Sequence, residues 1–231
     1  IGCRWSGGAH DKCQQLADLL MVDADESSFT SHHEAHCLHL DANGSARGAA
    51  ALPNLAAHRL NEGITNISEL LVKSELVVLL TALGGGTGSG ATAEIAAKSR
   101  DSGSLVISIV GIPFAEQPLR CAIAEKALPP IERNSDLCIR VSLERLAWQA
   151  RHRDSDWKLG SEWIGELIEG LVTTLARVGK MNLDLMDLRT VVGRPGNATL
   201  IVGNGTTDDP DGVVRMARDS PLSEISVDGA K

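Results

Sequence analysis

The stretch Glu75-Leu-Val-Val-Leu-Leu-Thr-Ala-Leu83, followed directly by Gly84-Gly-Gly-Thr-Gly-Ser-Gly90, decides how this chain folds. Its first part is a nearly continuous aliphatic run, which is typical of a strand buried on both faces of a parallel sheet. Its second part holds five glycines in seven residues. Helical sequence follows at Ala91–Arg100, and a second apolar strand follows at Ser104–Ile112. A strand, a loop, a helix and a strand within about 40 residues predict a βαβ unit, and therefore an α/β protein with a parallel sheet.

The residues before this unit predict a similar order. Ile1-Gly-Cys and Gly7-Gly8 indicate a strand end and a glycine turn, ahead of a helix at Asp11–Leu20. A short strand is expected to end at Asp23-Ala-Asp25, and a helix is expected from Leu55 to about Leu71.

The spacing of apolar residues changes after the βαβ unit. A helix to about Leu128 and a strand at Asp136–Val141 come first. Apolar residues then recur every four residues from Trp163 to Leu175, which predicts an amphipathic helix from Trp157 to Arg177, ~30 Å long. We therefore expect a nucleotide-binding domain at 1–155, a long central helix at 156–180, and the start of a smaller C-terminal domain at 181–231.

Composition narrows the class of protein. The 231 residues are 43% hydrophobic and 23% charged, with a formal net charge of −8. This balance supports a buried core and argues against nucleic acid as the main partner. No apolar run approaches the ~20 residues of a membrane span, so no direct membrane insertion is expected. Five scattered cysteines without a C-x-x-C pair indicate reduced thiols in a cytoplasm, and the start at Ile1 suggests a fragment.

The glycine-rich segment is suited to phosphate. Backbone N–H groups at the start of a helix can turn toward an anion. The segment lacks the Lys of a P-loop, because Ala91 follows Gly90. It fits the dinucleotide pattern at Gly86, Gly88 and Ala91, but the next strand does not end in the acidic residue that would bind a ribose. An NAD-binding domain is therefore disfavoured, and a turn without a ligand is the structural alternative.

Gly84–Gly90 resembles the signature G-G-G-T-G-[ST]-G of the tubulin/FtsZ family, and the resemblance extends over nearly the whole chain. It implies a parallel-sheet GTPase domain, a long central helix and a smaller C-terminal domain. The other matching segments are Ile1–Gly8, Gly48–Pro53, Pro113–Glu125, Met181–Thr190, Ser220–Leu222 and Val227–Lys231.

The resemblance also implies which residues contact the nucleotide. The phosphates of GTP or GDP would lie on the glycine segment and the earlier glycines, with Asp23 or Asp25 near a water-bound Mg²⁺. Glu116 and Arg120 would contact the ribose, although their spacing alone would suggest an ordinary ion pair on a helix. Trp157 would stack on guanine, and Glu162 would accept hydrogen bonds from the guanine N–H groups. Without the resemblance, Trp157 would be interpreted as the start of a helix and Glu162 as a solvent-exposed residue. The phosphate residues are Gly7, Gly8, Gly84, Gly85, Gly86, Thr87, Gly88, Ser89 and Gly90.

Asn182, Asp184 and Asp187 are the catalytic residues that the resemblance implies. Considered without it, they are residues that favour the start of a helix. In the family, this segment reaches the nucleotide of the next subunit and polarises the attacking water. The resemblance thus implies a cytoplasmic GTPase of cell division that hydrolyses GTP only in a head-to-tail filament of its own copies. It also implies division-machinery proteins as partners. The alternative is a nucleotide-binding scaffold that joins or caps filaments with little hydrolysis.

Some residues depart from the family pattern. The first glycine loop reads Arg4-Trp5-Ser6, and a Trp there would either block the phosphate or swing away from it. Leu143 replaces an Asn that contacts the base, and Ala9 replaces another Asn. A separate cluster, Ser31–His39, is rich in potential metal ligands but lacks zincin spacing, so an exposed strand edge is favoured over a metal site.

Overall fold

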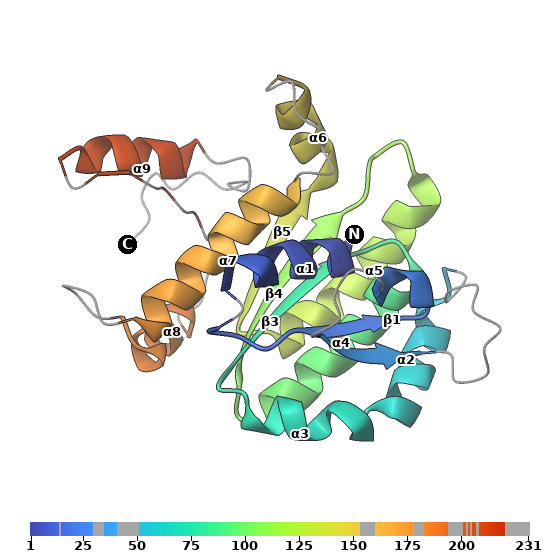
Figure 1. Ribbon diagram of the computed structural model, residues 1–231. Coiled ribbons are helices and arrows are strands. Elements are labelled where there is room, and N and C mark those ends of the chain that lie inside the picture. The colour runs from blue at the N-terminus through green and yellow to red at the C-terminus, as the bar shows by residue number, and fades with distance from the viewer. Residues whose placement is uncertain are drawn as a thin grey trace.

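The computed structural model describes residues 1–13, 15–29, 35–40, 51–152, 160–177, 183–193, 201, 203, 205–206 and 208–219. Two parallel sheets form its centre, with helices on both sides (Figure 1). The α/β class and the parallel pairing predicted from the sequence are confirmed. No helix within these ranges is long and apolar enough to cross a membrane.

The larger sheet holds three strands in the order β3-β4-β5. The strands β3 (Leu76–Ala82), β4 (Leu105–Ile112) and β5 (Leu137–Ser142) fall close to the predicted positions. Leu76 pairs with Leu105, and Ile107 pairs with Leu137. The central strand β4 is buried on both faces, in keeping with a sequence in which Ser108 is the one polar residue.

The second sheet pairs β1 (Leu20–Asp23) with β2 (His36–His39), also in parallel. Between them lies the short 3-10 helix η1 (Glu26–Phe29). The pair packs against α2 (Pro53–Gly63) and α3 (Thr65–Lys73) around the fully buried Leu60. The helix expected from Leu55 to Leu71 is thus two helices with a break at Ile64.

The first helix, α1, spans Gly2–Cys13, so the expected strand end and glycine turn are wrong. The cause is Trp5, which is 3% exposed and packs its ring over β4. A Cβ placed on Gly111 would lie 2.9 Å from that ring. Trp5 therefore points into the core, which answers whether it would block the phosphate. Leu143 lies beside it and is also buried.

The long helix α7 (Gly160–Ala176) lies alongside α1 (Figure 1). A Cβ on Gly165 would lie 3.5 Å from the carbonyl oxygen of Gly8, and Lys12 Nζ lies 3.9 Å from Glu169 Oε2. Residue numbers rise along both helices from the first of these contacts to the second, so the two helices run in the same direction. Three further helices are α6 (Leu143–His152), α8 (Leu185–Val192) and α9 (Pro210–Arg218).

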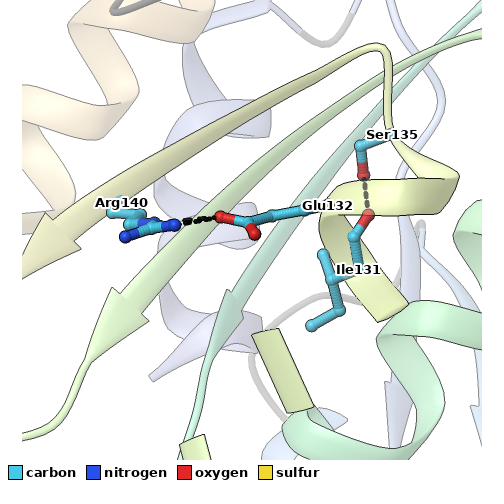
Figure 2. Close-up of polar contacts among 4 residues, drawn as sticks. All are labelled: Ile131, Glu132, Ser135 and Arg140. Carbon is cyan, nitrogen blue, oxygen red and sulfur yellow. Dashed lines mark hydrogen bonds and ion pairs between the residues drawn. The ribbon is translucent and has the colours of Figure 1, made fainter. Parts of the chain in front are cut away.

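The helix α5 (Pro118–Asn134) extends past the predicted end at Leu128, even though Pro129 and Pro130 lie inside it. Its last turns are held by buried contacts with the sheet, including Ile131. At its end, the Ser135 hydroxyl donates to the Ile131 carbonyl oxygen at 2.8 Å, and Arg140 Nε of β5 donates to Glu132 Oε1 at 3.0 Å (Figure 2). Packing thus outweighs the backbone hydrogen bonds that the two prolines remove.

We expect Trp5→Ala to lower the free energy of unfolding by about 3–5 kcal/mol, because the substitution leaves a large cavity over β4. Trp148→Ala is the matched control, since Trp148 is 55% exposed and should cost about 1 kcal/mol or less. Urea denaturation followed by circular dichroism measures both. Equal losses for the two variants would contradict the core position of Trp5.

Candidate functional site

The helix α4 (Gly86–Asp101) begins inside the glycine-rich segment rather than after it. Only Leu83–Gly85 separates it from β3. The N-cap residue Gly85 makes no side-chain capping hydrogen bond. The first N–H groups of a helix have no partner within the helix, and together with the helix dipole they favour an anion. The predicted phosphate position therefore coincides with an uncapped helix start.

Three of the glycines are explained by tight packing. Gly84 has φ of +89°, and a Cβ there would lie 2.8 Å from Arg120 Cβ. A Cβ on Gly88 would lie 2.3 Å from the Ala82 carbonyl oxygen, and one on Gly90 would lie 2.0 Å from that of Pro53. Gly88 and Gly90 must be glycine for α4 to lie this close to β3 and α2, and Gly84 must be glycine for the turn before α4 to pass Arg120.

Gly85 differs from its neighbours, because a Cβ placed there would meet nothing within 4 Å. Its φ of −106° and ψ of 174° suit any amino acid. The packing thus gives no reason for a glycine at this position, whereas a ligand lying on the helix start would. Among these glycines, Gly85 therefore gives the most direct support for a bound phosphate.

Ser89 serves the loop itself. Its hydroxyl accepts a hydrogen bond from the Gly84 N–H at 2.9 Å, and the side chain is 5% exposed. We therefore assign Ser89 to holding the Leu83–Gly85 turn in shape. This role does not depend on a bound nucleotide.

Asp23, at the end of β1, joins several elements at the start of α4. Its Oδ1 lies 3.4 Å from the Thr87 hydroxyl and accepts from the Ala24 N–H at 2.7 Å. Its Oδ2 accepts from the Ser28 hydroxyl at 2.8 Å and lies 3.8 Å from Cys3 Sγ. Of the two acidic candidates, Asp23 is therefore the one at the site.

Asp25 points elsewhere. It is exposed and accepts from both the N–H and the hydroxyl of Ser27, at 3.0 and 2.7 Å. These hydrogen bonds lower the pKa of its carboxyl group. Asp25 therefore fixes the start of η1.

Cys3 was not among the residues that the sequence singled out. It lies in the first turn of α1, and its thiol points toward Asp23 and the Val22 carbonyl oxygen. Burial, and secondarily the Asp23 carboxylate, raise the pKa of this thiol to about 11. At neutral pH the thiol is therefore protonated and can donate a hydrogen bond. Its position shows that α1, like α4, begins beside Asp23. No sequence pattern marks an isolated thiol of this kind.

Gly7 and Gly8 do not form a phosphate loop. They lie in the second turn of α1, where the Gly8 carbonyl oxygen faces Gly165 of α7. The Trp5 N–H already bonds to the Ile1 carbonyl oxygen at 2.9 Å, so only Gly2, Cys3 and Arg4 can offer free helix-start N–H groups.

The two ribose candidates lie near the glycine turn but are not paired. Glu116 is in an exposed turn before α5, and Arg120 is in the first turn of that helix. No ion pair joins these two residues, so the helix-face ion pair suggested by their spacing is wrong. The backbone and Cβ of Arg120 pack against Gly84, so this residue lies beside the glycine turn.

Glu162 lies at the same end of the molecule. It is exposed in the first turn of α7, about one turn before the Gly165 contact with α1. Because α1 and α7 run in the same direction, the start of α7 is level with the start of α1. Trp157 and Asn182 lie outside the described residues.

Asp184 and Asp187 form a reciprocal capping box at the start of α8. The Asp187 N–H donates to Asp184 Oδ1 at 2.8 Å, and the Asp184 N–H donates to Asp187 Oδ2 at 3.1 Å. The interpretation of these residues as a helix start is confirmed. Both carboxylates are exposed, so a further role is not excluded by burial.

The capping box lies at the far end of the sheet from the glycine segment. Arg189 of α8 donates to the Gly103 carbonyl oxygen at 2.6 Å, just before β4 begins. The glycine segment follows the opposite, carboxyl end of the seven-residue β3, which spans roughly 23 Å. Asp184 and Asp187 therefore cannot reach a nucleotide bound at the α4 start of the same subunit.

The metal-ligand cluster lies only partly in the described residues, because residues 30–34 are outside them. His36 and Cys37 are exposed on β2, and His39 Nε2 lies 3.2 Å from the Ala24 carbonyl oxygen. Within the part of the chain that the structure describes, no three His, Cys, Asp or Glu side chains gather as a metal site.

The uncapped α4 start and the Asp23 junction are the features expected of a nucleotide site, and comparison with known proteins identifies the family. The sequence model of the tubulin/FtsZ family, GTPase domain, matches residues 8–149. The chain belongs to the tubulin/FtsZ family. The resemblance seen in the sequence is thereby confirmed.

Curated relatives include cell division proteins. Cell division protein FtsZ 1 of Archaeoglobus fulgidus is 31% identical over 188 residues, which cover 80% of this chain and 51% of the relative. Cell division protein FtsZ of Haloferax mediterranei is 29% identical over 100% of this chain and 64% of its own length. The chain therefore spans about half to two thirds of the length of these relatives.

Solved structures share the fold. The empty FtsZ dimer of M. jannaschii has a TM-score of 0.82 at 22% identity, over 97% of this chain and 68% of that chain. A GTPγS-bound protofilament of CetZ2 from Haloferax volcanii has a TM-score of 0.62 at 17% identity, over 74% of this chain and 56% of that chain.

We expect Gly88→Ala to lower the free energy of unfolding by about 1–3 kcal/mol, because its methyl group would collide with the Ala82 carbonyl oxygen. Gly85→Ala should leave stability unchanged or raise it by about 0.4–1 kcal/mol. Thermal and urea denaturation of the two variants test this difference. A large loss in Gly85→Ala would show that the turn is packed differently.

Proposed function

We propose that this chain binds GTP or GDP, with Mg²⁺, at the start of α4. The observation that carries the proposal is the uncapped helix start at Gly85–Gly86, flanked by Asp23 on one side and Arg120 on the other. Helix-start N–H groups suit phosphate oxygens, and a carboxylate beside them suits the waters of a bound Mg²⁺. Family membership supports the same ligand.

The proposed contacts combine the geometry of the described residues with the family resemblance. The N–H groups of Gly85, Gly86 and Thr87 bind phosphate, and the first turn of α1 replaces Gly7 and Gly8 in this role. Glu116 and Arg120 contact the ribose, while Trp157 and Glu162 recognise the guanine.

We further propose that the protein of which this chain is part hydrolyses GTP in a head-to-tail filament. Asp184 and Asp187, together with Asn182, would complete the nucleotide site of the next subunit. Their distance from the subunit's own site supports an action in trans. In phosphoryl transfer, positioning and charge provide most of the catalysis, so carboxylates that orient water are sufficient. Cell division in the cytoplasm, with division proteins as partners, is the proposed setting.

The non-hydrolysing scaffold is the second candidate, and one observation favours it. The capping box gives Asp184 and Asp187 a structural reason to be present that is independent of catalysis. Their presence therefore does not by itself imply hydrolysis. The burial of Trp5 favours the GTPase instead, because it leaves the nucleotide end of α1 open.

We expect GTP to bind more tightly than ATP. A carboxylate at Glu162 accepts from both the N1–H and the N2–H of guanine, which adenine cannot offer. Glu162→Gln should lower the preference about tenfold or more, and Glu166→Gln, one turn later on α7, should not. Calorimetric titration of each nucleotide measures this. Equal affinity of the unmodified chain for GTP and ATP would refute guanine recognition.

We expect turnover per subunit to rise with protein concentration, because each site would need carboxylates from a neighbour. Asp187→Asn keeps an oxygen acceptor for the capping box but removes the charge, so it should abolish most turnover while GTP binding persists. Asp209→Asn, which changes the capping residue of α9, is the control that should retain turnover.

A mixing experiment makes this test sharper. Asp187→Asn and Thr87→Ala each damage a different half of the shared site, so a mixture contains some intact junctions. Recovered turnover in the mixture supports catalysis in trans. Turnover that is independent of concentration would refute catalysis in trans. A wild-type protein that binds GTP without turnover at any concentration would favour the scaffold.

A further inference from the structure

Donors from several elements surround the carboxylate of Asp23, and they divide between its two oxygens. Oδ1 accepts from the Ala24 N–H at 2.7 Å and faces the Thr87 hydroxyl of α4 at 3.4 Å. Oδ2 accepts from the Ser28 hydroxyl of η1 at 2.8 Å, and Cys3 Sγ of α1 lies 3.8 Å from it. Oδ1 is therefore the oxygen that faces the start of α4, and Oδ2 is the one that η1 holds.

Ser28 makes the shortest hydrogen bond that any described side chain gives to this carboxylate. A hydroxyl that donates to a charged oxygen forms one of the stronger hydrogen bonds in proteins. The Thr87 contact of 3.4 Å is long for two oxygens, and the thiol of Cys3 is a weak donor. Of the three side chains, Ser28 therefore does most to fix the position of Asp23.

The bond from Ser28 also fixes the orientation of the carboxylate. The Ala24 N–H holds one oxygen, and a group held at one oxygen can still turn about that contact. A second bond, to the other oxygen, fixes the plane of the group. This restraint matters for a bound Mg²⁺, because its water ligands adopt a nearly ideal octahedral geometry and a partner must meet them in the right direction.

The neighbouring serine has a different partner. Ser27 donates to Asp25 Oδ1 at 2.7 Å, and Asp25 is exposed and lies away from the start of α4. Two serines that are adjacent in η1 thus each hold a different aspartate. Only the aspartate held by Ser28 contacts α4, so the two serines form a matched pair for comparison.

We propose that Ser28 is a positioning residue of the nucleotide site. Its hydroxyl holds Asp23 Oδ2, so that Oδ1 points to the start of α4 and can accept hydrogen bonds from the waters of nucleotide-bound Mg²⁺. This role rests on the nucleotide binding proposed above. Ser28 itself touches neither nucleotide nor metal, so its loss weakens the part of the affinity that depends on Mg²⁺ and leaves the remainder.

Calorimetric titration with a non-hydrolysable GTP analogue tests this role on the full 231-residue chain. Each titration is made with Mg²⁺ and with EDTA, at a protein concentration where light scattering detects no assembly. The ratio of the two dissociation constants gives the Mg²⁺-dependent gain in affinity. We expect Ser28→Ala to lower this gain about threefold to tenfold, the usual effect of one lost hydrogen bond, and to leave the affinity in EDTA unchanged.

Two comparisons separate positioning from a general structural effect. Ser28→Thr keeps a hydroxyl and should retain most of the gain, and Ser27→Ala, the matched control, should retain all of it. Asp23→Asn should lower the gain by itself. Adding Ser28→Ala to Asp23→Asn should then lower the gain no further, because Ser28 acts through that carboxylate.

Four results would overturn the role of Ser28 while the nucleotide site stands. They are an affinity that does not depend on Mg²⁺ in the unaltered chain, an unchanged gain in Ser28→Ala, an equal loss with Mg²⁺ and with EDTA, and additive effects of the Ser28 and Asp23 substitutions. An unaltered chain that does not bind the analogue in either solution would refute the nucleotide site itself, and the role of Ser28 with it.

Discussion

The position of α4 depends on two backbone contacts that only glycine permits. Gly88 rests on the last carbonyl of β3, and Gly90 rests on the first carbonyl of α2. These contacts force the helix to start directly at the end of the strand, with its unpaired N–H groups beside Asp23. They also connect the two sheets, because β3 belongs to one and α2 packs on the other. The anion site and the relative position of the sheets therefore share one cause.

The glycine-rich segment shows how far the sequence could be interpreted. The apolar run before it and the helical residues after it predicted the βαβ unit, because strand burial and helix periodicity are local patterns. The separate roles of its glycines could not be predicted. Gly85 and Gly88 are identical in sequence, and they differ only in whether a carbonyl from elsewhere in the chain lies against them.

The α1 region shows why local patterns failed. Arg4-Trp5-Ser6-Gly7-Gly8 contains weak helix formers, and its glycines and serine resemble a turn. The helix forms because Trp5 gains a buried position over β4 that a turn would not provide. The same argument explains α5, where burial of Ile131 carries the helix past two prolines. In both cases, contacts distant in sequence outweigh a local preference of about 1–3 kcal/mol.

The two ends of the molecule differ in charge. At one end the starts of α1 and α4 meet at Asp23, and the start of α7 is level with that of α1, so this end carries the positive ends of three helix dipoles. The opposite end exposes the carboxylates of Asp184 and Asp187, already held in a fixed geometry by their own capping box. Because the capping box already restrains both side chains, they would lose little further conformational entropy on contact with a partner. This complementarity of charge supports the head-to-tail association proposed above. The structural and the catalytic interpretations of these aspartates are therefore compatible, since the cap that starts α8 is also what would hold the charges ready for a neighbour.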